Sequence, residues 1–244
     1  MALSPCRRRG PREALRRPDP RARHAGAHRQ PRVANETKAA LFWGIYERAE
    51  IDFVRRHLDG DLDVVELGGS IGVLSCAILR GMVDSAKLVS VEADPALTGV
   101  LEQNLASNHP GRRYSVLQQA VSYSAAPGSA VDYSVGESNV SGHVVGSGDA
   151  ERGTLRSVPA TTLSRILEEN EVGDYALVAD IEGAEVQILL HDVAGLARCR
   201  EIIIELHQTD VDGTRFTVEN LVDRIEALGF RLVDGYGTVC AFRR

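Results

Sequence analysis

The chain has 244 residues, which is enough for one ordinary domain, or two small ones, with a hydrophobic core that needs no disulfide bonds. Hydrophobic residues make up 43% and charged residues 25%, a composition that excludes a disordered or fibrous protein. The net charge of −6 is uneven, because residues 1–32 carry ten Arg and two acids whereas the other 212 residues carry 18 basic and 32 acidic groups. An acidic body argues against a folded nucleic-acid-binding domain, which needs a cationic face.

The four cysteines lie far apart, and none has the spacing of a zinc site or a disulfide framework. The expected location is therefore a reducing compartment, the cytoplasm. No apolar run reaches the roughly 18 residues of a transmembrane helix, so no membrane partner is expected.

Residues 1–32 form an Arg- and Pro-rich segment with few large apolar side chains, which predicts a disordered tail. No apolar stretch follows Arg9, so the pattern does not predict a signal peptide. Three interpretations remain open: an inert or misassigned extension, a segment that contacts a polyanion, or a transit peptide, which the five prolines disfavour.

The body of the chain begins with a predicted helix within residues 33–60, where apolar side chains recur at spacings of three and four. Short apolar runs then alternate with helical segments. The predicted strands are 62–67, 87–91, 114–118, 175–179 and 201–206, followed by a hairpin of 231–234 and 238–242, with helices near 71–81, 95–107, 161–170, 183–190 and 217–228. This alternation predicts an α/β fold over residues 61–244, a mostly parallel sheet of about seven strands with a C-terminal antiparallel hairpin.

One segment, residues 122–159, interrupts this alternation. It is rich in Ser, Gly and Val and is too long for an inert connection, so it is predicted to be a hairpin or a lid over the substrate.

A glycine-rich turn follows the first predicted strand, where Glu66 precedes Gly68, Gly69, Ser70 and Gly72. No Lys follows in the P-loop position, and neither register of the glycines fits the nicotinamide fingerprint. The order of an acid followed by Gly-x-x-x-Gly resembles motif I of class I methyltransferases, which bind S-adenosyl-L-methionine (SAM). A generic strand–helix turn is the alternative interpretation.

Two later strand ends extend the predicted cofactor site. Glu92 lies 24 residues after Gly68, close to the offset at which a carboxylate meets ribose hydroxyls, and Ala93 follows it. Asp94 precedes Pro95, which predicts a helix cap with Pro in the first helical position. Gln119 and Ala120 follow the third strand, where the resemblance to class I methyltransferases implies contact with the adenine; a surface loop is the alternative interpretation.

The most specific segment is Asp180-Ile181-Glu182-Gly183-Ala184-Glu185, followed by Glu205 and His207. With the two earlier motifs, its order resembles the FkbM family of SAM-dependent methyltransferases over about residues 60–208. The sequence departs from the family pattern at three positions: Ala179 replaces the usual Lys, Glu66 replaces Asp, and Ser164 replaces the acid of a Thr-Leu-Asp stretch.

The resemblance implies a Rossmann-like class I methyltransferase that transfers a methyl group from SAM. The implied cofactor-binding residues are Glu66, Gly68, Gly69, Ser70, Gly72, Glu92, Ala93, Gln119, Ala120 and Asp180, and the candidate catalytic residues are His207, Asp180 and Glu182. The reaction depends mainly on aligning the acceptor, and a base is optional. Three possibilities for the base remain open: His207, one of Asp180 and Glu182, or no dedicated base at all. The side chains of Asp180, Glu182, Glu205 and His207 offer ligands for Mg²⁺, but the spacing does not require a metal.

The resemblance further implies O-methylation of a hydroxyl on a small molecule, such as a sugar or polyketide-type natural product. Trp43 and Tyr46 are either acceptor contacts or simple core residues. The alternatives are a nucleic-acid methyltransferase or binder that uses the basic tail, a non-catalytic protein with the same fold, and a nicotinamide-dependent oxidoreductase, which the glycine spacing disfavours. The sequence does not predict the oligomeric state.

Overall fold

A computed structural model describes residues 48–135, 142–144 and 154–244. The chain divides into two units, Met1–Arg32 and Val33–Arg244. The predicted tail, the first half of the predicted N-terminal helix, and Trp43 and Tyr46 lie outside the described residues.

The described elements alternate between strands and helices as the sequence predicts. The helices are α2 (Arg48–His57), α3 (Val73–Gly81), α4 (Pro95–Asn108), α5 (Leu163–Glu169), α6 (Glu185–His191) and α7 (Val218–Ala227). The strands are β1 (Asp63–Leu67), β2 (Leu88–Glu92), β3 (Tyr114–Gln118), β4 (Ala120–Val121), β5 (Ala130–Val135), β6 (Gly142–Val144), β7 (Thr154–Thr161), β8 (Tyr175–Ala179), β9 (Cys199–Glu205), β10 (Thr209–Val211), β11 (Thr214–Phe216), β12 (Arg231–Tyr236) and β13 (Val239–Arg243).

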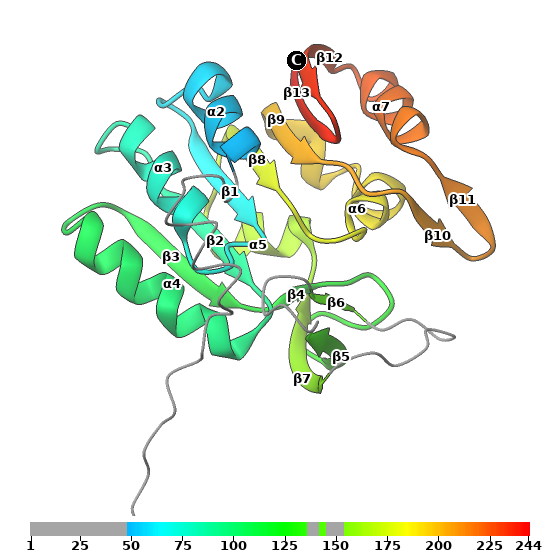
Figure 1. Cartoon of the computed structure of the whole chain (residues 1–244), viewed down its shortest axis with the longest axis horizontal. Coiled ribbons are helices and arrows are strands. Elements are labelled where there is room, and N and C mark those ends of the chain that lie inside the picture. Colours follow the sequence, from blue (N-terminus) through cyan, green and yellow to red (C-terminus); the bar gives the residue numbers. More distant parts are fainter. Residues whose placement is uncertain (1–47, 136–141, 145–153) are drawn as a thin grey trace, which may run out of the picture. The chain divides into compact units, whose positions relative to one another are not determined.

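A seven-stranded sheet in the order β12-β13-β9-β8-β1-β2-β3 forms the centre of the fold (Figure 1). The strands from β9 to β3 are parallel, whereas β13 runs antiparallel to both β9 and β12. The prediction of a mostly parallel sheet with a C-terminal antiparallel hairpin is therefore confirmed.

Helices cover both faces of this sheet (Figure 1), because alternate residues of each buried strand point to opposite faces. Val64 packs with α2, α3 and α4 in one apolar cluster, and Val65 packs with α5, α6 and α7 in another. Helix α2 contributes Phe53 and Val54 to the first cluster. Both layers fix the strand ends on which the site is built.

The segment predicted as a hairpin or lid forms most of a second sheet in the order β4-β7-β5-β6, in which β4 lies just before the segment. Strand β5 pairs antiparallel with β7 from Ala130↔Pro159 to Val135↔Thr154. Residues 136–141 and 145–153 of this segment lie outside the described residues.

Asp94 caps α4, as the sequence predicts. Its side chain accepts a 2.8 Å hydrogen bond from the amide of Ala96, with Pro95 in the first helical position. This cap fixes the chain direction just beyond Glu92. In the described part of the chain, no helix combines the length and the apolar character needed to cross a membrane.

Candidate active site

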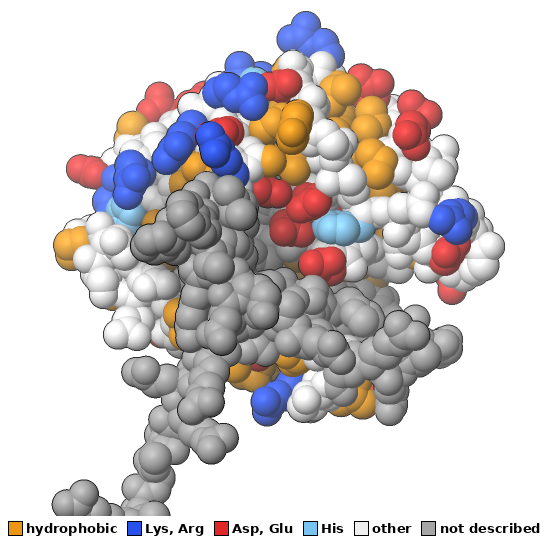
Figure 2. Space-filling model, in the orientation of Figure 1, with side chains coloured by type: hydrophobic (Ala, Val, Ile, Leu, Met, Phe, Trp, Pro, Cys, Tyr) orange, Lys and Arg blue, Asp and Glu red, His pale blue; other side chains and the backbone are white. Residues whose placement is uncertain are grey.

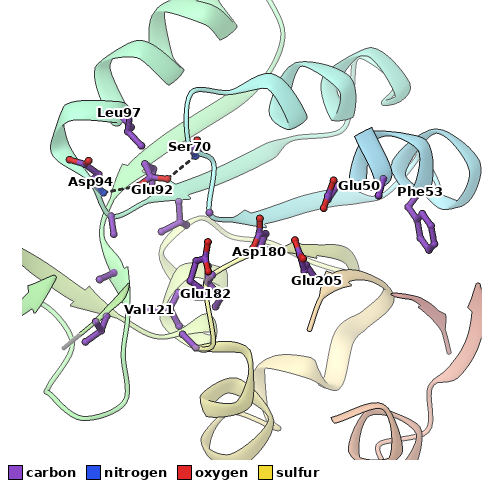
Figure 3. A pocket seen from close by; sticks show the side chains of 18 of the residues that line it. Glu50, Phe53, Ser70, Glu92, Asp94, Leu97, Val121, Asp180, Glu182 and Glu205 are labelled. Carbon is purple, nitrogen blue, oxygen red and sulfur yellow. Dashed lines mark hydrogen bonds between the residues drawn. The ribbon is translucent and has the colours of Figure 1, made fainter. Parts of the chain in front are cut away.

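A cavity of about 810 Å³ opens at the carboxyl ends of the parallel strands, the usual place for a ligand in an open α/β sheet. Figure 3 shows its two ends. Ser70, Glu92 and Asp94 lie at one end, whereas Glu50 and Phe53 of α2 lie at the other, with Asp180 between them. The cavity therefore has room for two reactants side by side.

The turn after β1 brings backbone unusually close to the cavity. Gly68 has φ +89°, and a Cβ there would lie 1.9 Å from the backbone oxygen of Asp180. A Cβ on Gly69 would lie 2.3 Å from Oγ of Ser90. Only glycine fits at these two positions, so the predicted motif has a steric cause.

Glu92 connects the end of β2 to this turn. Its Oε2 accepts a 2.7 Å hydrogen bond from the amide of Ser70, and its Oε1 accepts one of 2.7 Å from the amide of Asp94. Burial raises the pKa of the Glu92 carboxyl, while these backbone bonds oppose that change. Each carboxylate oxygen keeps a further lone pair, so the side chain can also accept from the two hydroxyls of a ribose.

Gln119 offers an unpartnered acceptor at the same end of the cavity. Its Oε1 is buried without a hydrogen-bond partner in the described part of the chain. The small side chains of Ala93 and Ala120 and the apolar side chain of Leu97 line the cavity beside it. A flat base with an exocyclic amino group, such as the adenine of SAM, fits this chemistry.

Glu66 is placed differently from the cavity-lining residues. Only 1% of it is exposed, its Oε2 accepts from the hydroxyls of Ser75 and Ser90, and its Oε1 has no partner among the described residues. Burial raises the pKa of its carboxyl to about 7. Glu66, Gly69 and Gly72 do not line the cavity. They shape the turn from beneath, and the implied binding of the cofactor by Glu66 stays a prediction.

Carboxyl groups gather at the middle of the cavity. Asp180 and Glu182 follow β8, Glu205 ends β9 and Glu50 comes from α2 (Figure 3). Figure 2 shows acidic side chains gathered beside a histidine on the face viewed. Burial and the negative charge of Glu205 raise the pKa of Asp180 to about 7, although the neighbouring His207 opposes this. Burial, together with Glu205, also raises the pKa of Glu50.

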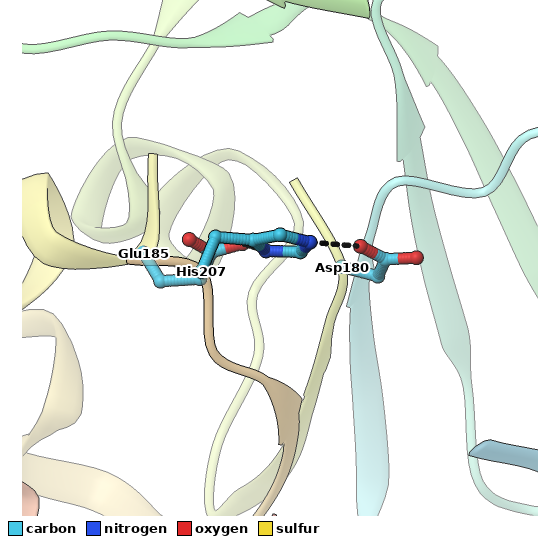
Figure 4. A group of neighbouring side chains, drawn as sticks. All are labelled: Asp180, Glu185 and His207. Carbon is cyan, nitrogen blue, oxygen red and sulfur yellow. Dashed lines mark hydrogen bonds and ion pairs between the residues drawn. The ribbon is translucent and has the colours of Figure 1, made fainter. Parts of the chain in front are cut away.

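His207 lies next to this group but does not line the cavity. Its Nδ1 is 3.1 Å from Oε1 of Glu185, and its Nε2 is 3.9 Å from Oδ1 of Asp180 (Figure 4). The same Nε2 is 3.7 Å from Oε2 of Glu182. Burial disfavours the cation, but these carboxylates outweigh it and raise the pKa of His207 to about 9. A pKa of about 9 favours the imidazolium at neutral pH, and an imidazolium has no lone pair for a further proton.

The same side chains form the one group in the described part of the chain with the geometry of a metal site. Ligand atoms of Asp180, Glu185 and His207 lie within 4.8 Å of one another. Nδ1 of His207 lies 3.1 Å from Oε1 of Glu185, and Nε2 faces the carboxylates of Asp180 and Glu182. Mg²⁺ prefers oxygen ligands to imidazole nitrogen, so this group, which includes a histidine, matches a Mg²⁺ site poorly.

Several residues that line the cavity are not predicted as site residues from the sequence. Glu50 and Phe53 come from α2, Tyr133 from β5, and Asp234 and Tyr236 from β12. The face formed by Ala49 and Phe53 is visible as helical spacing, but nothing local indicates that it reaches the end of β8. For the hairpin, the Gly235-Tyr236-Gly237 turn is the only signal in the sequence.

The comparison with family models decides the membership of the chain. The model for the methyltransferase FkbM domain matches residues 66–232, which is more than half of the chain. The chain belongs to the FkbM methyltransferase family. Its members transfer a methyl group from SAM, so the chain is a SAM-dependent methyltransferase, and Glu92, Gln119 and the glycine turn fit that cofactor. No curated protein matches the chain.

Solved structures share the fold at low sequence identity. Magnesium protoporphyrin IX methyltransferase from Synechocystis PCC 6803, with bound SAM, is 10% identical with a TM-score of 0.51, covering 86% of this chain and 85% of that one. Precorrin-6y C5,15-methyltransferase from Geobacter metallireducens is 11% identical, with a TM-score of 0.44 and coverage of 82% and 89%. A tRNA (m1A22) methyltransferase described as putative, from Streptococcus pneumoniae, is 11% identical, with a TM-score of 0.45 and coverage of 79% and 68%. The first of these shows the Rossmann-like fold.

Proposed function

We propose that this FkbM-family enzyme methylates a hydroxyl oxygen of a small molecule that carries several hydroxyls, a sugar or a polyketide-type product. The observation that carries the proposal is the position of Asp180, which lines the middle of the cavity between the Glu92 end and the Glu50 end. A single carboxyl group is thus available to both reactants.

The chemistry of methyl transfer to oxygen needs a place for one proton. When bound, SAM supplies an already activated methyl group, so the protein mainly has to orient the acceptor. Asp180 accepts the hydroxyl proton as the new bond to oxygen forms. A pKa of about 7 suits this role, because a base works best when its pKa is near the operating pH.

The acceptor end of the cavity suits a ligand with many hydroxyl groups. Glu50 and Glu205 present carboxyl oxygens there, and the hydroxyl of Thr238 donates a 2.8 Å hydrogen bond to Oε1 of Glu205, which holds that side chain in place. Carboxylates are acceptors for hydroxyl donors, and a polyol satisfies several of them at once. Phosphates of a nucleic acid would be repelled by the carboxylates of Glu50 and Glu205, which disfavours that alternative acceptor, although Arg48 and Arg56 also line the cavity.

The test is a transfer reaction with SAM labelled with ¹³C in its methyl group. Purified protein is incubated with panels of sugars, polyketides, amines and RNA, and the product methyl is assigned by two-dimensional NMR. The proposal expects an O-methyl ether on a small molecule, formed equally well with and without EDTA. A product methylated on nitrogen or on RNA would overturn the assignment of the acceptor, and loss of activity in EDTA would overturn the metal-free site.

A further inference from the structure

Glu185 is a buried carboxylate that the proposed reaction does not use directly. Its side chain has no exposed surface, and its Oε1 lies 3.1 Å from Nδ1 of His207 and accepts a 3.0 Å hydrogen bond from the amide of Ile181. Its Oε2 is buried without a partner in the described part of the chain. A buried ionised carboxylate is costly unless a cation compensates it, and the imidazole of His207 is the group in contact with it.

The far side of the same ring faces the proposed base. Nε2 of His207 points toward Asp180 in Figure 4, at 3.9 Å from Oδ1, and Glu182 lies 3.7 Å away. The charged groups facing His207 are thus Glu185 from α6, and Asp180 and Glu182 from the segment between β8 and α6. Those facing Asp180 are Glu205 at the end of β9, together with His207, Glu182 and Glu185. His207 is the one cation among the groups acting on Asp180 in the described residues.

We propose that Glu185 is a positioning residue that holds His207 as an imidazolium with Nε2 toward Asp180, so that His207 keeps Asp180 ionised. This inference rests on the proposed role of Asp180 as the proton acceptor. Without the cation, burial and the three carboxylates would raise the pKa of Asp180 further, and a protonated carboxyl cannot accept the hydroxyl proton. Glu185 therefore acts through His207 and does not touch the reactants.

The first test measures the proton on His207 without any turnover. The protein is labelled with ¹³C at the imidazole carbons, and the pKa of His207 is read from an NMR titration. Glu185→Gln keeps an oxygen that accepts from Ile181 and His207 but removes the charge, so the pKa of His207 should fall by about one pH unit or more. Glu201→Gln is the matched control, because Glu201 is also buried and hydrogen-bonded, at the other end of β9. A His207 pKa within about 0.3 of the unchanged protein would overturn the proposal.

The second test follows the effect on Asp180. His207→Gln removes the cation, so the pKa of the Asp180 carboxyl, read from its ¹³C signal, should rise above that of the unchanged protein. An unchanged or lower value would contradict the proposal, even if Glu185→Gln failed to fold. In turnover, Glu185→Gln should lower kcat by about tenfold or more with the KM for SAM within about twofold, and Glu185→Asp should recover part of the loss.

The two proposals fail in different ways. If both NMR titrations move as expected but Asp180→Asn keeps full activity, the arrangement of charges is real and the role of Asp180 as base is wrong. If methyl transfer to oxygen is found and depends on Asp180, but the pKa of His207 is the same in Glu185→Gln as in the unchanged protein, the positioning role of Glu185 is wrong and the proposed function stands.

Discussion

The carboxylate of Glu92 accepts a 2.7 Å hydrogen bond from the amide of Ser70, which ties the end of β2 to the glycine turn after β1. The turn holds Ser70 at φ +47°, in the left-handed region that few non-glycine residues adopt. One side chain thus supports the turn and faces the cavity. The ligand contact and the local fold therefore depend on the same carboxylate.

Glu92→Gln should weaken SAM binding by about 10- to 100-fold, because a carboxylate that accepts from ribose hydroxyls is replaced by an amide that can accept at only one atom. The variant should also melt at a lower temperature, since one backbone amide loses its acceptor. Titration calorimetry with SAM checks the affinity. The control is Glu102→Gln, an exposed glutamate on α4 that should change neither value. Unchanged affinity in Glu92→Gln would remove Glu92 from the cofactor site.

Gly68→Ala should destabilise the protein by about 2 kcal/mol or more, because its Cβ would lie 1.9 Å from the backbone oxygen of Asp180 at a φ of +89°. Urea unfolding measures the change. Gly99→Ala is the matched control, since that glycine lies inside α4 with nothing within 4 Å of its Cβ. Alanine there should stabilise the helix by up to about 1 kcal/mol. Equal stability of the two variants would show that the turn is not sterically constrained.

Glu66→Gln should flatten the pH dependence of stability. The folded-state pKa of Glu66 is raised to about 7 from its usual 4.5, so the folded protein binds a proton that the unfolded chain has already lost. Stability is therefore highest below pH 4.5 with respect to this group and falls as the pH rises toward 7, by about 3 kcal/mol. Melting temperatures from pH 5 to 8 should fall less in Glu66→Gln than in the unchanged protein. Parallel curves would mean that Glu66 stays ionised in the folded state.

The rate of methyl transfer should rise with pH through about 7, as Asp180 loses its proton and becomes able to accept one. Asp180→Asn should lower kcat by about 100-fold or more and abolish this rise. Initial rates with labelled SAM from pH 5.5 to 8.5 check it. Asp174→Asn, a change in an exposed acid just before β8, should leave the profile unchanged. A pH-independent rate in the unchanged protein would argue that no base operates.

Much of the fold can be read from the sequence because its causes are local. Strands β3 and β8 have the predicted bounds, since each is a short apolar run between polar turns. Asp94 followed by Pro95 marks a helix start that needs no other part of the chain. The glycine spacing likewise indicates a close approach of backbone, although not what is approached.

The site is less predictable because its causes are long-range. The side chain of Glu66 points inward because hydroxyl groups from α3 and β2 donate hydrogen bonds to its carboxylate. Nothing near Glu66 in the sequence indicates those partners. Glu185 and His207 are 22 residues apart and meet only because α6 packs beside the end of β9. The spacing of the acids in the segment 180–185 predicts that they lie at one edge of the sheet. It does not predict that Glu185 is buried while Glu182 faces the cavity.

The most direct test of the account is the structure of the protein bound to S-adenosylhomocysteine. We expect the ribose hydroxyls on the carboxylate of Glu92, the adenine amino group at Oε1 of Gln119, and the sulfur directed toward Asp180. A ligand bound away from Gly68 and Glu92, or a sulfur directed away from Asp180, would contradict the assignment of both the cofactor site and the base.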